Sequence, residues 1–174
     1  MNFLISGLVG NPRAGSKTLA ATRSLVDALA LDLGAEVGEV VDLAEFGGRV
    51  LDYSDPEVAK LRARLARVQL LVVATPVYKG SYTGLLKGFL DGYGPGSLDL
   101  TFAVPLTIAA SPAHSLAGPT HLVPLLDELG ALSPLGGLFL SDAVASQPDE
   151  RDAAIAAWID RRSVVLGSLA AVAA

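Results

Sequence analysis

Residues 10–18, with the sequence GNPRAGSKT, join two segments of different hydrophobic pattern. A short apolar strand is predicted over residues 2–6, and apolar residues recur at helical spacing over residues 16–33. A loop of small residues between a strand and a helix leaves backbone N–H groups free at the positive end of the helix dipole. This arrangement favours the binding of an anion such as a phosphate.

The side chains of this loop fit the same interpretation. Arg13 and Lys17 would add positive charge, and the hydroxyls of Ser16 and Thr18 would add hydrogen-bond donors. The alternative interpretation is a plain connecting loop in which Ser16 is the helix N-cap. The loop alone does not decide between the two.

The loop differs from the phosphate-binding motif of nucleoside triphosphatases, G-x-x-x-x-G-K-[ST]. Gly10 and Gly15 have the required separation, but an extra residue stands between Gly15 and Lys17. That residue moves the lysine away from its phosphate position. The next apolar strand, residues 70–74, ends without an aspartate that would bind Mg²⁺. The sequence therefore disfavours nucleoside triphosphate hydrolysis.

Composition excludes several classes of site. The chain has 174 residues, which suits one domain over residues 1–174, and its net charge of -5 with no basic stripe speaks against nucleic-acid binding. It has no cysteine, so disulfides and thiolate metal sites are excluded. With only two histidines, His114 and His121, we expect no histidine-built metal centre.

We expect neither a signal peptide nor a membrane-spanning segment. The N-terminus lacks the basic region of a signal peptide, and the apolar run at residues 164–174 is interrupted and too short to span a bilayer. We expect a cytoplasmic protein. Its hydrophobic fraction of 51% is high, which hints at apolar surface buried between subunits in a homodimer or homotetramer.

Strands and helices alternate along the chain. Strands are predicted at residues 2–6, 36–42, 70–74, 102–109 and 135–140, and helices at residues 16–33, 55–67, 82–93, 119–129 and 148–169. This alternation predicts an α/β fold with a doubly wound parallel sheet. Ligands of such folds bind beyond the carboxyl ends of the strands, at the point where the strand order reverses.

Single residues carry further expectations. Pro105 lies inside a predicted strand and indicates an irregular or partly edge-like position. Trp158 is expected in the core. Four cations of the second helix are expected on a solvated face: Lys60, Arg62, Arg64 and Arg67. Three carboxylates before the last helix are expected to be capping and surface charges: Asp142, Asp149 and Glu150.

Three loops of unusual composition lie at the carboxyl ends of strands, at residues 10–18, 75–81 and 110–118. In the second loop Tyr78 offers a flat ring and a hydroxyl, and Gly80 allows a ligand to approach the backbone. These features suit a planar heterocycle. The alternative is a Pro/Gly turn with its aromatic ring packed inward. We expect the three loops to meet at one edge of the sheet.

Two motifs resemble a known family. Residues 10–18 read GNPRxxSKT, and residues 75–91 read TPVYKGSYTGLLKGFLD. Over residues 2–142 the chain resembles the NAD(P)H-dependent FMN reductases, and most of all the flavin reductases of two-component monooxygenases of the alkanesulfonate type. The resemblance implies a flavodoxin-like three-layer sandwich around a five-stranded parallel sheet of order 2-1-3-4-5. It also implies FMN as cofactor, with NADPH or NADH as reductant.

The resemblance also implies site residues. The FMN phosphate would be held by Asn11, Arg13, Ser16, Lys17 and Thr18. The isoalloxazine and ribityl chain would be lined by Pro76, Val77, Tyr78, Lys79, Gly80 and Ser81. In the third loop Ser111 and His114 keep their places, although a loop-capping role suits His114 equally.

The third loop departs from the family pattern. Ala109 and Ala110 stand where relatives often have glycines close to the flavin, and Pro112 removes an N–H group. Thr120 and His121 occupy the region where the alkanesulfonate-type reductases carry an inserted tyrosine. Because these positions differ, weaker flavin binding is expected, and flavin transfer that depends on a partner does not follow from the resemblance.

The implied reaction is hydride transfer from nicotinamide C4 to flavin N5, which needs positioning rather than a catalytic acid or base. We therefore expect an NAD(P)H:flavin oxidoreductase that supplies reduced FMN to a partner monooxygenase. Two alternatives stay open: a quinone or azo reductase that keeps FMN bound, and a non-catalytic flavodoxin-like binding protein. The choice between NADPH and NADH also stays open.

Overall fold

The computed structural model describes residues 3–173 and contains a five-stranded parallel sheet. The strands are β1 (Leu4–Val9), β2 (Glu36–Asp42), β3 (Leu70–Pro76), β4 (Phe102–Ala109) and β5 (Leu138–Ser141). Their order is β2-β1-β3-β4-β5, which confirms the predicted flavodoxin-like topology. β1 lies between β2 and β3, so the strand order reverses beside it.

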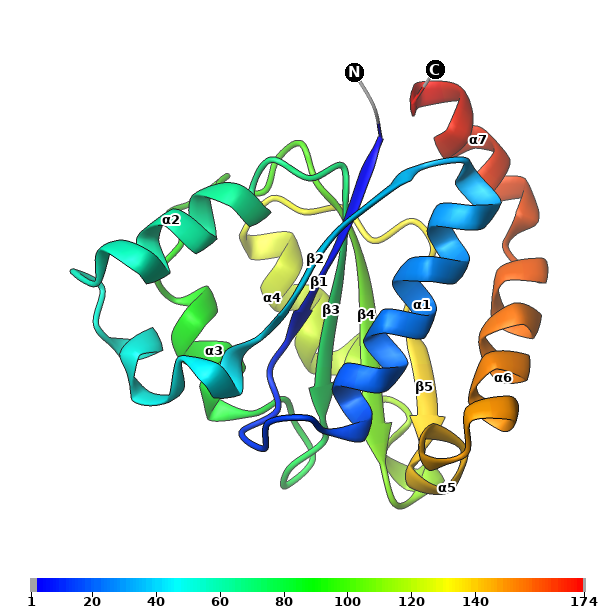
Figure 1. The fold of residues 1–174 in the computed structure, drawn as a ribbon, viewed down its shortest axis with the longest axis horizontal. Coiled ribbons are helices and arrows are strands. Elements are labelled where there is room, and N and C mark those ends of the chain that lie inside the picture. The colour runs from blue at the N-terminus through cyan, green and yellow to red at the C-terminus, as the bar shows by residue number, and fades with distance from the viewer. Residues whose placement is uncertain (1–2, 174) are drawn as a thin grey trace.

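Helices cover both faces of the sheet (Figure 1). They are α1 (Lys17–Leu33), α2 (Pro56–Leu65), α3 (Gly84–Leu90), α4 (Val123–Glu128), α5 (Asp142–Ser146), α6 (Pro148–Asp160) and α7 (Ser163–Ala173). One core cluster joins the sheet to α1, α6 and α7, and a second joins it to α2, α3 and α4. Short helical turns occur at Leu43–Glu45, Gly47–Leu51, Pro112–His114 and Gly118–Leu122. No helix among residues 3–173 is long and apolar enough to cross a membrane.

The predicted helix caps set the ends of α1 and the start of α2. The Ser16 hydroxyl accepts the N–H of Leu19 at 3.3 Å, and Gly34 ends α1 with a left-handed φ of 62°. Asp55 accepts the N–H groups of Glu57 and Val58 at the start of α2. These side chains stop or start helices through local bonds, which is why the sequence located those ends correctly.

Other boundaries differ from the predictions. β1 starts at Leu4 and continues to Val9, because Gly7 pairs within the sheet with Val72. A Cβ on Gly7 would lie 2.6 Å from Cγ2 of Thr22, so the glycine permits close packing of α1 on β1. The helix predicted at 148–169 is divided into α6 and α7, and α5 precedes the predicted range. α6 ends just before Arg162, which donates to the carbonyl of Trp158 at 3.1 Å.

Three other predicted elements were too long, whereas β3 continues to Pro76, beyond the predicted strand at 70–74. The helix predicted at 82–93 is only α3, because Thr83 is its N-cap. The helix predicted at 119–129 is a π-helical turn followed by α4. The strand predicted at 135–140 begins at Leu138, after Gly136 adopts a φ of 64°.

Pro105 occupies the position that its missing N–H allows. It pairs in register with Val73 of β3, whereas the pairing of β4 with β5 begins one residue later, at Leu106. The partly edge-like position predicted for this proline is confirmed. Trp158 is also in the core as predicted, and its Nε1 donates to the carbonyl of Gly137 at 3.0 Å.

The prediction for Arg62 is wrong, although Lys60, Arg64 and Arg67 are exposed as expected. Arg62 is 6% exposed, its Nε donates to the carbonyl of Phe89 at 2.8 Å, and its Nη2 donates to the carbonyl of Val50 at 3.0 Å. The guanidinium thus joins α2 to α3 and to the turn at Gly47–Leu51, and its polar atoms find carbonyl partners although the side chain is buried. Charge alone pointed this residue to solvent, and only the tertiary contact explains its burial.

Candidate functional site

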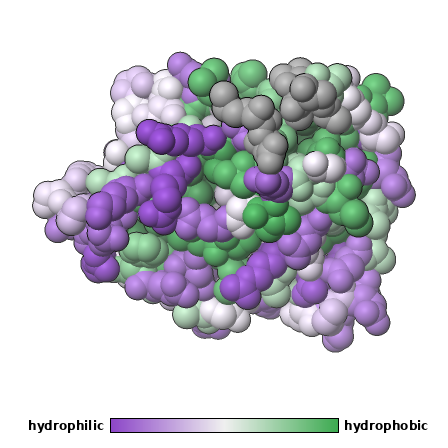
Figure 2. Space-filling view, turned by 45° about the horizontal axis from the view of Figure 1, so that its top comes forward, coloured by the Kyte–Doolittle hydropathy of each residue, from purple (hydrophilic) through white to green (hydrophobic). Residues whose placement is uncertain are grey.

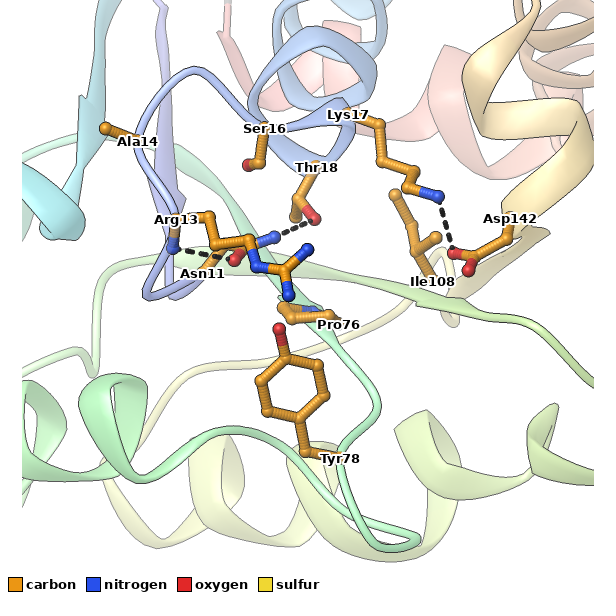
Figure 3. A pocket seen from close by; sticks show the side chains of 10 residues that line it. All are labelled: Asn11, Arg13, Ala14, Ser16, Lys17, Thr18, Pro76, Tyr78, Ile108 and Asp142. Atoms are coloured by element: carbon orange, nitrogen blue, oxygen red, sulfur yellow. Dashed lines mark hydrogen bonds and ion pairs between the residues drawn. The ribbon is translucent and has the colours of Figure 1, made fainter.

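A cavity of about 380 Å³ lies at the carboxyl ends of β1, β3 and β4, beside the start of α1 (Figure 3). This volume is within the range of about 300–1,000 Å³ that is usual for small-molecule sites. Ten residues line it: Asn11, Arg13, Ala14, Ser16, Lys17, Thr18, Pro76, Tyr78, Ile108 and Asp142. Seven of the predicted site residues are among them, and they come from the first and second loops.

Asn11 shapes the first loop from within. It is 6% exposed, its Oδ1 accepts the N–H of Arg13 at 3.0 Å, and its Nδ2 donates to Oγ1 of Thr18 at 3.0 Å. The side chain therefore ties the start of the loop to the first turn of α1. Asn11 and Thr18 hold the loop in shape, which is a positioning role beyond the direct contact expected from the sequence.

Asp42 supports the loop from the end of β2. This carboxylate is 5% exposed and accepts the N–H of Gly15 and the N–H of Ala44, each at 3.2 Å. Gly15 itself has a φ of 64°, a conformation that glycine adopts without strain. Sequence reasoning missed Asp42. Its position as the last residue of a strand next to the reversal point was the available signal.

Gly10 and Thr83 join the first loop to α3. A Cβ on Gly10 would lie 2.4 Å from Cβ of Leu86, so only glycine fits between the loop and this helix. The Thr83 hydroxyl donates to the carbonyl of Gly10, and its oxygen accepts the N–H of Leu86 at 3.1 Å. The loop is thus fixed at both its ends and at its centre.

Residues with unbonded backbone N–H groups line the cavity at the start of α1. Within residues 3–173 the structure records no acceptor for the backbone N–H groups of Ser16, Lys17 and Thr18. The guanidinium of Arg13 has no acidic partner among the same residues, and Figure 3 shows it extending between Thr18 and Tyr78. Three N–H groups at a helix N-terminus beside a free cation form a donor set that matches a phosphate monoester.

Lys17 points to the other side of the cavity. Its Nζ lies 3.2 Å from Oδ1 of Asp142, and the two side chains are 40% and 44% exposed (Figure 3). Asp142 lies in the first turn of α5, where a carboxylate is favourable, as the sequence led us to expect. It also lines the cavity, which its position in the sequence did not predict.

The second loop is a tight turn. Tyr78 and Ser81 exchange backbone hydrogen bonds of 2.9 and 3.2 Å, and between them Lys79 and Gly80 have φ values of 53° and 84°. Two successive positive φ angles are typical of a type I′ turn. Tyr78 is 44% exposed, and Figure 3 shows its hydroxyl directed toward Pro76. The inward-packed alternative for this ring is therefore wrong.

The other residues predicted in the second loop do not line the cavity. Pro76 and Tyr78 do, while the rest form the turn beyond it: Val77, Lys79, Gly80 and Ser81. Their backbone conformation sets the direction in which Tyr78 points.

The third loop contributes least to the cavity. Ser111 caps its own short helical turn by accepting the N–H of Ala113 at 3.3 Å, and His114 is exposed. Neither lines the cavity, and Ile108 of β4 does so instead. Ala109 is 4% exposed and pairs with Ser141 of β5, so of the two alanines only Ala110 is exposed.

Known proteins share this architecture. A relative described as an NADH-dependent FMN reductase, SfnE, of Pseudomonas putida is 34% identical over 159 residues, which is 89% of this chain and 86% of the relative. An FMN reductase (NADPH) of Pseudomonas aeruginosa is 31% identical over 146 residues, which is 81% of this chain and 78% of the relative. The crystal structure of an NADH:FMN oxidoreductase, EMOB, superimposes with a TM-score of 0.78 at 27% identity, over 90% of this chain and 88% of that one.

The family model described as NADPH-dependent FMN reductase matches residues 3–145. This range contains the three loops and all ten residues that line the cavity. The resemblance inferred from the two sequence motifs is therefore confirmed, and the chain belongs to the NADPH-dependent FMN reductase family.

Proposed function

We propose that FMN binds in the cavity between the first and second loops, where the chain reduces it with NADH or NADPH. The observation that carries this proposal is the donor set at the start of α1, where three unbonded N–H groups stand beside the unpaired guanidinium of Arg13. A dianionic phosphate is the group that such a site binds best.

The phosphate would contact Arg13, Ser16, Lys17 and Thr18, while Asn11 holds the loop that presents them. Arg13 suits this role because a guanidinium can form two parallel hydrogen bonds to phosphate oxygens. The buried Asn11–Thr18 hydrogen bond keeps the backbone donors in place before the ligand arrives.

The flavin ring and ribityl chain would lie along the second loop, which comprises Pro76, Val77, Tyr78, Lys79, Gly80 and Ser81. Ser111 and His114 would stand at the outer edge of the site. When bound, FMN supplies a ring that accepts a hydride from the nicotinamide. The chain's own contribution is to hold the flavin by its phosphate and to leave a side of the cavity open for the nicotinamide.

The test follows NADH and NADPH oxidation at 340 nm with FMN, FAD and riboflavin in turn. We expect oxidation that saturates with FMN and a protein that purifies with little bound flavin. No oxidation above the protein-free rate would contradict the proposal and favour a flavodoxin-like binding protein. Tightly bound FMN with faster turnover on a quinone or an azo dye would favour the alternative reductases.

We further propose that the chain delivers reduced FMN to a flavin-dependent monooxygenase in the cytoplasm. The support is the family and the half-exposed phosphate site, in which Lys17 and Asp142 are 40% and 44% exposed. Product formation by such a monooxygenase with NADH or NADPH and catalytic FMN should depend on this chain. A chemical supply of reduced FMN that gives the same yield would show that the two proteins need no contact.

A homodimer or homotetramer is proposed as well, and its support is the hydrophobic fraction of 51%. The apolar residues in α3 and just before it add little. Leu86, Phe89 and Leu90 are fully buried within the subunit, which leaves Tyr82 and Leu85 half-buried. Other apolar side chains reach the surface, and Figure 2 shows them interspersed with hydrophilic residues on the face toward the amino ends of the strands. Light scattering at micromolar concentration checks the proposal, and a monomer would contradict it.

A further inference from the structure

The end of the cavity where the phosphate is proposed to bind has one negatively charged and two positively charged side chains. Arg13, Lys17 and Asp142 all line it, and Lys17 is engaged with Asp142 at 3.2 Å. A phosphate entering the cavity therefore meets one unpaired cation and one cation that is already neutralised. The sequence of the first loop contains two cations, but in the folded chain only Arg13 is without an acidic partner among the described residues.

An ionised aspartate cannot help to bind a phosphate. A carboxylate accepts hydrogen bonds and has none to donate, and its charge repels a phosphate dianion. It also competes with the phosphate for the same ammonium group, because Lys17 has to leave Asp142 or be shared between two anions. Both effects lower the affinity for the phosphate and leave the contacts to the flavin ring unchanged.

We propose that Asp142 is a specificity-determining residue that limits the affinity for the FMN phosphate by holding Lys17, so that FMN exchanges as a substrate. This inference rests on the proposed function. It explains how a loop that is fixed at several points can still release its ligand: the loop positions the donors, and Asp142 sets how strongly one of them is available.

The size of the effect follows from the exposure of the pair. Because both side chains are about half exposed, solvent screens the interaction. Replacing Asp142 by asparagine should therefore tighten FMN binding by about three- to tenfold rather than by orders of magnitude. The gain should appear mainly as slower FMN dissociation, since most affinity changes within one site are in the dissociation rate.

The experiment is a titration of FMN and of riboflavin, followed by quenching of flavin fluorescence. The variants are Asp142→Asn, Lys17→Met and the double variant, and Asp160→Asn is the matched control. Asp160 is exposed at the far end of α6, so its substitution changes the net charge equally without touching the cavity. Circular dichroism melts show that each variant is folded.

We expect Asp142→Asn to tighten FMN and leave riboflavin within twofold, and Asp160→Asn to change neither. Lys17→Met should weaken FMN, and in that background Asp142→Asn should gain less than half of its effect in logarithmic units. An unchanged or weaker FMN affinity in Asp142→Asn, or equal tightening of both flavins, would overturn the inference alone. A folded wild-type protein that binds no FMN would overturn it together with the proposed function.

Discussion

The first and third loops lie at the same edge of the sheet, but they are built differently. The first loop is held by buried side chains, since Asn11 and Thr18 bond to each other and Asp42 accepts the N–H of Gly15. The third loop is exposed at His114, and Ser111 caps only its own turn. The first loop therefore has its shape before any ligand arrives, as the proposed phosphate site requires, whereas the third loop is held only by bonds within its own turn.

Arg13→Ala should have the largest effect on flavin binding, because it removes the unpaired cation of the first loop. Loss of a charge-assisted hydrogen bond costs roughly 1.5–3 kcal/mol, so FMN affinity should fall by about tenfold or more. Riboflavin affinity should change far less because riboflavin lacks the phosphate. Flavin titration measures both, and Arg23→Ala is the control, since Arg23 is an exposed cation further along α1. Equal losses for the two flavins would refute this placement of the phosphate.

Asn11 and Ser111 make the same kind of local hydrogen bond, each to the N–H two residues further along the chain. Asn11 accepts the N–H of Arg13, and Ser111 accepts the N–H of Ala113. Asn11→Ala also leaves the buried Thr18 hydroxyl without its donor, so it should lower the free energy of unfolding by about 1–2 kcal/mol. Ser111→Ala should cost less than about 0.5 kcal/mol because the serine is partly exposed. Urea denaturation measures both, and similar losses would show that the first loop is no better built than the third.

The contrast between the loops also explains what the sequence predicted well. The alternation of strands and helices, the caps at Ser16, Gly34 and Asp55, and the charged and hydroxyl residues of the first loop that line the cavity depend on local signals within a few residues of one another. The strand order, in contrast, followed from the family resemblance. Hydrophobic period, N-cap chemistry and glycine position carry that information directly.

What the sequence did not predict depends on partners far along the chain. The buried guanidinium of Arg62 donates to the carbonyls of Val50 and Phe89, which lie 12 and 27 positions away in the sequence. Asp142 forms an ion pair of 3.2 Å with Lys17, although Lys17 is 125 positions earlier in the chain. Charge and helix periodicity place both residues on the surface. Asp142 reaches the cavity because α5, which follows β5, packs against α1. No local sequence pattern predicts this contact.

The second loop offers a smaller test. Lys79 is the one non-glycine residue with a positive φ within residues 3–173, and it lies at the first central position of the Tyr78–Ser81 turn. Asparagine tolerates that conformation better than lysine, so Lys79→Asn should raise the free energy of unfolding by about 0.5–1 kcal/mol. Thermal denaturation measures the change. Lys79→Ala is the comparison, because it removes the same charge without the tolerance, and an equal gain from alanine would point to charge instead of backbone strain.

His114→Ala should have the smallest effect. The imidazole is exposed. Within residues 3–173, His114 forms a hydrogen bond through its backbone N–H, which donates to the carbonyl of Ser111 at 3.1 Å. Removing an exposed side chain changes a free energy by about 0.5 kcal/mol or less, so FMN affinity should shift by less than about threefold. If His114 instead contacts the nicotinamide nucleotide, the KM for NADH or NADPH should rise while the affinity for FMN holds. Steady-state kinetics beside a flavin titration separates the two. A loss of FMN affinity as large as that of Arg13→Ala would mean that the third loop closes over the flavin and is as much a part of the prepared site as the first.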